Sequence, residues 1–280
     1  MSNWNRWGEN DERGAANLLT NDVVLAACDA PRSGRVYNLG IELNRNAPYA
    51  GNRVSPQHFM SADGGDYAAL GRDDWGTADD YLFLACGGTS HIDALAHVWS
   101  GGTLYNGHSF REVRSSGAAK CGIEKTGGLV TRGILMDFTE RETEGGQINS
   151  EHLDAWCAEH SIEPRSGDAL IIRTGWMDDA LTDSLGDKAY PVLGLEAASW
   201  IERHDLSMIA ADNQAVETVG RRGVLPPLHG IVMRDLGVYI LEMLVLREPA
   251  EDGVTQGLFV VAPLLISRGV NSPANPLLIA

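Results

Sequence analysis

Cysteine is scarce in this chain, and the few cysteines are far apart. The 280 residues include four, at Cys28, Cys86, Cys121 and Cys157, and no two of them form a Cys-x-x-Cys pair. This spacing argues against a zinc knuckle and against a dithiol redox centre. It fits a protein of a reducing compartment.

Long apolar runs and positive charge are also scarce. The longest uninterrupted apolar stretch, residues 258–266, is too short to span a bilayer and contains Pro263. Residues 1–7 lack the apolar core of a signal peptide, so we expect a cytoplasmic protein. With 22 basic and 38 acidic residues the net charge is -16, which argues against nucleic acid and anionic membranes as partners.

Three common catalytic signatures are absent. The sequence contains no Gly-x-Ser-x-Gly elbow and no His-Glu-x-x-His helix, and its 32 glycines form no Gly-x-x-x-x-Gly-Lys phosphate loop. The chemistry must therefore come from another arrangement of side chains.

Strand and helix patterns alternate along the chain. Strands are predicted at 128–138, 169–173, 207–211 and 257–262, and helices at about 150–160, capped by Asn149 or Ser150, and at 195–204. No internal repeat and no Pro/Ser-rich linker divides the sequence. We therefore expect one α/β domain over residues 1–280.

The chemistry concentrates in residues 87–97, GGTSHIDALAH. The preceding segment, 81–86, is apolar and is predicted to be a buried strand, on which alternate side chains share a face. His91 and Asp93 then share a face, and an imidazole beside a carboxylate is a common ligand pair for zinc or manganese. The alternative is a His–Asp hydrogen bond that satisfies a half-buried turn. Both interpretations stay open when His97 is added.

Glu242 interrupts an apolar run, residues 236–246. In a helix its neighbours three and four positions away are not charged, and in a strand it shares a face with aliphatic residues. A buried glutamate needs a partner, which is either an arginine elsewhere or a metal ion. Considered together with His91, Asp93 and His229, the pattern favours the metal.

These residues resemble the putative cyclase family, which includes bacterial arylformamidases (kynurenine formamidases) and isatin hydrolases. The family hallmark is His-x-Gly-Thr-His-x-Asp-x-Pro-x-His, followed later by a His and a Glu. Residues 90–97 match its second half, and His229 and Glu242 match the later pair. The segments 6–20, 104–107, 132–133 and 167–176 are similar to the longer branch of the family, so the resemblance covers nearly the whole chain.

Two hallmark positions differ. Gly87 stands at the first hallmark His, and Leu95 stands at the hallmark Pro. Gly87 has the strand parity of the two expected ligands and so lies on the metal face without offering a ligand, whereas Cys86 points away unless a bulge intervenes. Without the first hallmark histidine we expect one metal ion instead of two, weaker metal binding, an open coordination position, or a site that no longer catalyses. His58 is a candidate replacement ligand, with an ordinary structural histidine as the alternative.

The resemblance implies a metal-dependent hydrolase. Zinc or manganese held by His91, Asp93, His229 and Glu242 would polarise a carbonyl and lower the pKa of bound water toward about 7, so that hydroxide attacks an amide. His97 is the candidate acid and base, with a ligand role as the alternative. The expected substrate is a cyclic amide or aryl formamide, with lactones and esters as variants. A metal-dependent cyclase or lyase and a non-catalytic relative remain as alternatives.

The resemblance also implies an architecture, a swivelling β/β/α-type domain with a central barrel-like mixed sheet and outer helices. Such proteins associate, so a dimer or tetramer is expected, and residues 1–20 are a candidate arm toward a neighbouring subunit. The alternative is packing on their own subunit. Asp212, at the end of a predicted strand, is a candidate contact to substrate or to a histidine, with an Asx turn as the alternative. Arg173 and Trp176 are candidates to shape a pocket, or else a surface arginine and a core indole.

Overall fold

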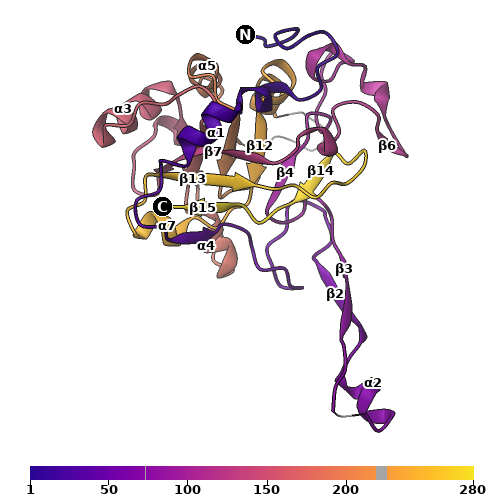
Figure 1. Cartoon of the computed structure of the whole chain (residues 1–280). Coiled ribbons are helices and arrows are strands. Elements are labelled where there is room, and N and C mark those ends of the chain that lie inside the picture. Colours follow the sequence, from indigo (N-terminus) through magenta and orange to yellow (C-terminus); the bar gives the residue numbers. More distant parts are fainter. Residues whose placement is uncertain (73, 219–225) are drawn as a thin grey trace.

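A mixed nine-stranded sheet organises the chain (Figure 1). The computed structural model describes residues 1–72, 74–218 and 226–280. The strand order is β1-β15-β13-β7-β9-β11-β12-β4-β14. The four central strands, β7, β9, β11 and β12, pair in parallel, and every strand added outside them pairs antiparallel. The strands of this sheet are β1 (Val36–Asn38), β4 (His91–Asp93), β7 (Leu129–Asp137), β9 (Ala169–Arg173), β11 (Met208–Ala211), β12 (Tyr239–Glu242), β13 (Gln256–Val261), β14 (Asn271–Pro273) and β15 (Leu277–Ile279).

Smaller elements surround the main sheet. Three two-stranded ribbons pair β2 with β3, β5 with β6 and β8 with β10. Their strands are β2 (Gln57–Ala62), β3 (Asp79–Phe83), β5 (Val113–Arg114), β6 (Gly117–Ala118), β8 (Gln147–Ile148) and β10 (Val192–Leu193). The α-helices are α1 (Asn21–Ala27), α2 (Gly64–Ala69), α3 (Ser150–His160), α4 (Trp176–Leu181), α5 (Ala197–Arg203), α6 (Pro227–His229) and α7 (Arg247–Glu251), and a π-helix, η6 (Gly230–Asp235), follows α6. Five short 3-10 helices complete the described chain: Gly14–Leu18, Tyr105–Gly107, Phe110–Glu112, Ile123–Lys125 and Glu144–Gly146.

The central strands are apolar on both faces because the sheet is covered there. β9 and β11 are buried along almost their whole length, as expected of parallel strands between layers. α3 and α5 pack against each other outside the sheet (Figure 1). Asn149 is the N-cap of α3, as one of the two predicted cap residues, and its backbone N–H donates to the His152 ring. The strands and helices predicted between residues 128 and 262 are confirmed to within about two residues. The mixed α/β class with outer helices is also confirmed.

One hairpin projects from the body (Figure 1). It consists of β2 and β3 and carries α2 near its tip. The prediction that residues 81–86 form a buried strand is wrong: the strand ends at Phe83, and Tyr81 and Phe83 are 70% and 63% exposed. An apolar pattern shows that side chains favour leaving water, but it does not show what covers them.

The N-terminal segment packs on its own chain. The Trp4 indole N–H donates to the Arg234 carbonyl at 2.7 Å, and the Asn3 backbone N–H donates to the Asp235 carbonyl at 2.8 Å. The Asn106 side chain, on a residue with φ 57°, donates to three carbonyls of residues 8, 9 and 11. A contact between residues 1–20 and a second subunit stays a prediction. Among the described helices, none has the length and apolar character that crossing a membrane requires.

Candidate metal centre

Three predicted ligands meet where β4 lies between β12 and β14. Backbone pairing sets Glu242 opposite His91 and Asn271 opposite Asp93. Directly opposed residues project to the same face, and His91 and Asp93 also share a face because side chains alternate along a strand. Glu242 is therefore on a strand, which decides between the two conformations that its apolar run permits.

The geometry of these three side chains fits a divalent cation. One ligand atom from each of His91, Asp93 and Glu242 lies within 4.8 Å of the others, and all three residues are at most 5% exposed. His91 Nδ1 donates to the Thr89 carbonyl at 2.7 Å, so the proton is on Nδ1. The Nε2 atom then faces Asp93 Oδ1 at 3.5 Å and Glu242 Oε2 at 3.7 Å. Two carboxylates buried beside a nitrogen lone pair need a positive charge, and this donor set suits zinc or manganese.

His229 joins the cluster through Glu242. Its Nε2 lies 3.2 Å from Glu242 Oε1, and among the described residues Glu242 pairs with histidines and with no arginine. Burial alone would lower the pKa of the His229 imidazole, but its hydrogen bonds to Glu217 and Glu242 outweigh burial and raise the pKa to about 10. Burial would raise the pKa of Glu242, whereas its hydrogen bond to His229 and the nearby His91 hold it well below its usual range. The lowered pKa keeps the buried Glu242 carboxylate ionised.

Sequence reasoning missed Glu217. Its carboxylate accepts from the backbone N–H groups of Leu228 at 2.9 Å and His229 at 2.8 Å, and from His229 Nδ1 at 2.8 Å. It therefore orients the imidazole and satisfies two free N–H groups at the start of α6. Nothing in the pattern around residue 217 marks it, because the segment is a series of bends whose partners lie eleven and twelve residues away.

His97 lies on the accessible side of the centre. Its side chain is 27% exposed, and its Nε2 is 3.9 Å from Asp93 Oδ2. The Asn271 amide NH2 donates to Asp93, and because a carboxylate only accepts, this contact fixes which way the amide faces. The same Nδ2 lies 3.2 Å from His97 Nδ1, so Nδ1 accepts and the proton of the neutral ring is on Nε2.

Asn271 is a second residue that the sequence did not reveal, and its side chain lies against Gly87. A Cβ atom added to Gly87 would lie 3.2 Å from both Cγ and Nδ2 of Asn271. Gly87 lies in a turn, so the strand parity expected for it does not apply. The residue opposite Asp93 on β14 thus occupies the space beside the altered hallmark position.

The other candidates lie outside the cluster. His58 is on the projecting hairpin, 51% exposed in its side chain and paired with Asp80 at 2.6 Å. Cys86 is exposed. A ligand role for His58 stays a prediction that the described geometry does not favour.

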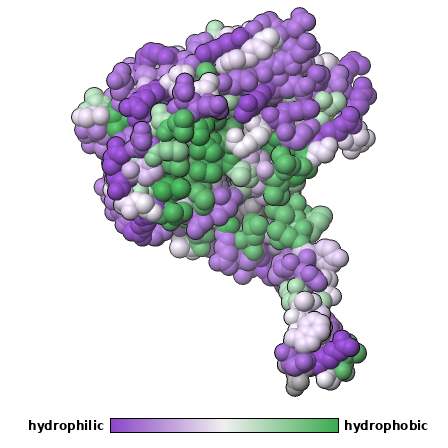
Figure 2. All heavy atoms as spheres, in the orientation of Figure 1, coloured by the Kyte–Doolittle hydropathy of each residue, from purple (hydrophilic) through white to green (hydrophobic). Residues whose placement is uncertain are grey.

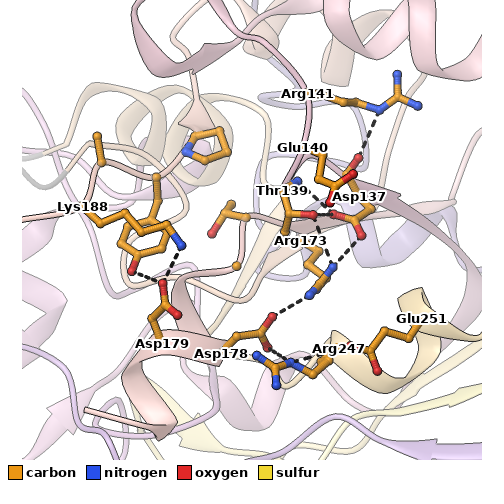
Figure 3. Close-up of a pocket in the computed structure, with 15 residues that line it drawn as sticks. Asp137, Thr139, Glu140, Arg141, Arg173, Asp178, Asp179, Lys188, Arg247 and Glu251 are labelled. Atoms are coloured by element: carbon orange, nitrogen blue, oxygen red, sulfur yellow. Dashed lines mark hydrogen bonds and ion pairs between the residues drawn. The ribbon is translucent and has the colours of Figure 1, made fainter. Parts of the chain in front are cut away.

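A charged cavity lies elsewhere, at the carboxyl ends of β7 and β9 (Figure 3). It encloses about 770 Å³ and is lined by charged groups that pair with one another. Arg173 bridges Asp137 and Asp178, each at 2.6 Å, and Lys188 contacts Asp179 at 2.6 Å. Arg173 therefore lines a pocket as predicted, but its charge is already compensated.

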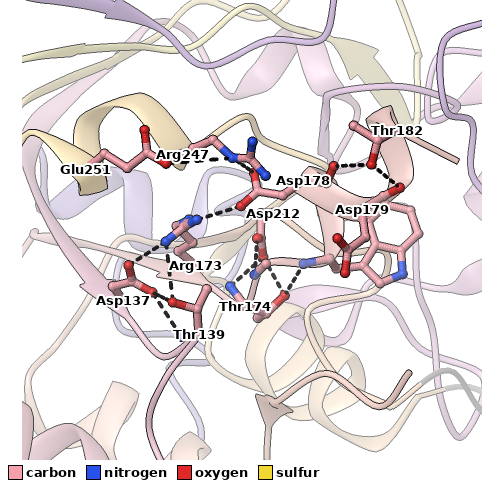
Figure 4. Close-up of polar contacts among 12 residues, drawn as sticks. Asp137, Thr139, Arg173, Thr174, Asp178, Asp179, Thr182, Asp212, Arg247 and Glu251 are labelled. Carbon is pink, nitrogen blue, oxygen red and sulfur yellow. Dashed lines mark hydrogen bonds and ion pairs between the residues drawn. The ribbon is translucent and has the colours of Figure 1, made fainter. Parts of the chain in front are cut away.

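Asp212 supports the turn beside this cavity (Figure 4). It accepts from the N–H and hydroxyl of Thr174 at 2.8 and 2.7 Å and from the N–H of Gly175 at 2.7 Å. Burial raises its pKa to about 6 against the lowering effect of these bonds. Its described contacts are those of a structural group. Trp176 lines a smaller cavity of about 310 Å³ together with Glu217.

Solved structures with this architecture support the interpretation of the fold. One described as a novel cyclase is 34% identical, covers 100% of this chain and 98% of its own, and has a TM-score of 0.90. An isatin hydrolase bound to the product analogue thioisatinate is 19% identical, with 88% and 92% covered and a TM-score of 0.65. A structure titled a potential metal-dependent hydrolase with cyclase activity is 16% identical, with 88% and 98% covered and a TM-score of 0.57. A comparison with curated proteins finds no match.

A family model gives the same assignment from the sequence. The model described as "Putative cyclase" matches residues 37–218, which include β4 and the hallmark segment. The relatives found by structure are cyclases and hydrolases by their own titles. The chain belongs to the putative cyclase family.

Proposed function

We propose that this protein is a metal-dependent hydrolase that cleaves the amide bond of a small cyclic amide or aryl formamide, with lactones and esters as variants. The observation that carries the proposal is the buried cluster of His91, Asp93 and Glu242 with the accessible His97 beside it. Isatin hydrolases and a structure described as a potential metal-dependent hydrolase share the fold, which supports this reaction class.

Four buried side chains are the proposed metal ligands. His91, Asp93 and Glu242 would hold zinc or manganese, with His229 as a fourth ligand through Nε2. When bound, the cation would supply Lewis acidity for the scissile carbonyl and make a bound water more acidic. Thr89 fixes the ring of His91, so the ligand is oriented before the ion arrives.

His97 is placed to move a proton. Asn271 supplies the hydrogen bond to Nδ1, so proton exchange takes place at Nε2, the nitrogen nearer to Asp93. A positioned histidine of this kind contributes about 10²–10⁴-fold to a hydrolysis rate. Trp99, two residues after His97, is 46% exposed. Its ring stacks on the ring of Phe110, with 6.1 Å between the ring centroids. They offer an apolar contact for an aryl substrate.

Metal content per chain tests the first half of the proposal. Protein purified without chelator should carry zinc or manganese by elemental analysis, His91→Ala should lose it, and His58→Ala should retain it. His58 is the matched control because it is a histidine paired with a carboxylate outside the cluster. Absence of metal after reconstitution with either ion would overturn the proposal.

Turnover tests the second half. The metal-loaded protein should hydrolyse a cyclic aryl amide or an aryl formamide, and His97→Gln should retain metal while kcat falls about 10²–10⁴-fold. A His97→Gln protein with full metal content and native kcat would remove the acid and base role. Full metal content with no hydrolysis of amide, lactone or ester would leave a metal protein with another function.

A further inference from the structure

The projecting hairpin has one aromatic face. Backbone pairing sets Phe59 opposite Tyr81, and Phe83 is two residues beyond Tyr81, so the three rings share a face. They are 51%, 70% and 63% exposed. The opposite face has no aromatic ring on these strands apart from the His58 imidazole: it carries Leu82, Met60 and the ion pair between His58 and Asp80.

We do not expect this hairpin to be stable when it is surrounded only by water. Every residue of β3 and all but the last residue of β2 are exposed. A lone two-stranded hairpin is at best marginally stable in water. Its three rings present on the order of 300 Å² of aromatic surface, already similar to the largest apolar patch of a typical monomer. We therefore expect this face to be covered in the working protein.

The body carries a second uncovered apolar surface. On β1, β15 and β13, pairing places Val36 beside Ile279 and Ile279 beside Leu258, while Leu277 lies beside Val260. These side chains share the outer face of the sheet, where Val36 is 53% exposed and the others are half-buried. Figure 2 shows an apolar area over this part of the body, in the same view as the hairpin.

A neighbouring loop enlarges this outer sheet surface. Leu264 and Leu265, which follow β13 after two intervening residues, are 56% and 78% exposed. They lie between β13 and β14, the strand that pairs with β4 beside the base of the hairpin (Figure 1). The outer sheet surface is thus the face of β1, β15 and β13 together with Leu264 and Leu265.

We infer that the aromatic face of the hairpin packs on the outer sheet surface of a second copy of this chain. One chain carries both halves of the contact, and the hairpin extends away from its own body (Figure 1). A two-fold axis would make the exchange reciprocal, so each copy gives one hairpin and receives one. Two such contacts would bury on the order of 1,200 Å² in total, the lower range of stable interfaces. The inference is independent of the metal centre.

Sedimentation velocity at micromolar concentration tests the inference. The native chain should sediment as a dimer or a larger closed assembly, and Tyr81→Glu and Val36→Glu should each weaken association at least tenfold. Leu82→Glu is the matched control, because it places the same charge one residue away on the opposite face of the hairpin. Circular dichroism should be unchanged in all three. A monomeric native chain, or an assembly that tolerates Tyr81→Glu, would overturn the inference.

Mixing the variants separates this contact from any other interface. Tyr81→Glu retains an intact sheet surface and Val36→Glu retains an intact hairpin, so an equimolar mixture restores one of the two contacts. The mixture should associate more tightly than either variant alone. No gain on mixing would overturn the pairing of hairpin with sheet.

Discussion

Replacing Glu217 by glutamine tests a carboxylate that contributes both to folding stability and to the candidate metal centre. Glu217 accepts three hydrogen bonds, two at Oε1 and one at Oε2. A glutamine side chain presents one oxygen and one NH2, so at least one of these N–H donors faces another donor. A buried donor left without a partner costs about 1–3 kcal/mol. The metal-free Glu217→Gln protein should therefore unfold with a free energy lower by that amount.

The same change should weaken metal binding. His229 loses the carboxylate that fixes its ring, and loss of such a partner costs about 10–100-fold in metal affinity. That range corresponds to about 1.4–2.8 kcal/mol of binding free energy. The effect on metal is separable from the effect on folding, because the first is measured on folded protein.

Two assays and one control complete the design. Urea unfolding with a chelator gives the stability of the metal-free chain, and competition with a zinc-binding dye gives the affinity. Glu248→Gln is the control, since that carboxylate is 65% exposed in its side chain and pairs with Arg35 at the surface. It should change stability by no more than about 0.5 kcal/mol. A zinc Kd for Glu217→Gln within about twofold of native would refute its role in orienting His229.

Three other changes have expected outcomes. The raised pKa of Asp212, about 6, means that the native chain holds this proton more tightly than the unfolded chain. The free energy of unfolding should therefore fall as pH rises from about 4 to 6. Measured by urea unfolding, Asp212→Asn should show a smaller change of this free energy over that pH range, and should be less stable by about 1–3 kcal/mol because a hydrogen-bond donor loses its acceptor. Arg132→Met should cost about 3–5 kcal/mol by urea unfolding, since it leaves the buried carboxylate of Asp168 unpaired; an equally stable variant would contradict that. Gly87→Ala should weaken metal binding, because the added methyl group would contact Asn271. In a double-mutant cycle measured by dye competition, the same change should have a smaller effect when Asn271 is already alanine.

The regular core and the hallmark residues were accessible from the sequence because their signals are local. Strands such as β9 show as apolar runs, and the alternation of a strand is enough to set His91 and Asp93 on one face. Glu242 alone did not distinguish a metal ligand from half of an ion pair, and its combination with the histidines and Asp93 favoured the metal before the family resemblance was considered.

The rest of the site depends on contacts between distant segments. Asn271 reaches Asp93 across 178 positions, and Glu217 reaches His229 through a bend with no periodic pattern. The hairpin was mistaken for core for a related reason, since Tyr81 and Phe83 have the composition of a buried strand and lack only the cover. Patterns report the preference of a side chain, whereas topology decides its neighbours.

The place of β4 in the sheet has a consequence for how the protein is made. β4 comes from the first third of the chain, but both of its neighbours, β12 and β14, come from the last third. A ribosome that has just added Asp93 must translate on to Pro273 before the strand can acquire its second neighbour, which takes about 10–40 s. At the start of that interval His91 and Asp93 have neither Glu242 nor Asn271 beside them. The candidate metal centre is therefore complete only after the last third of the chain has been made.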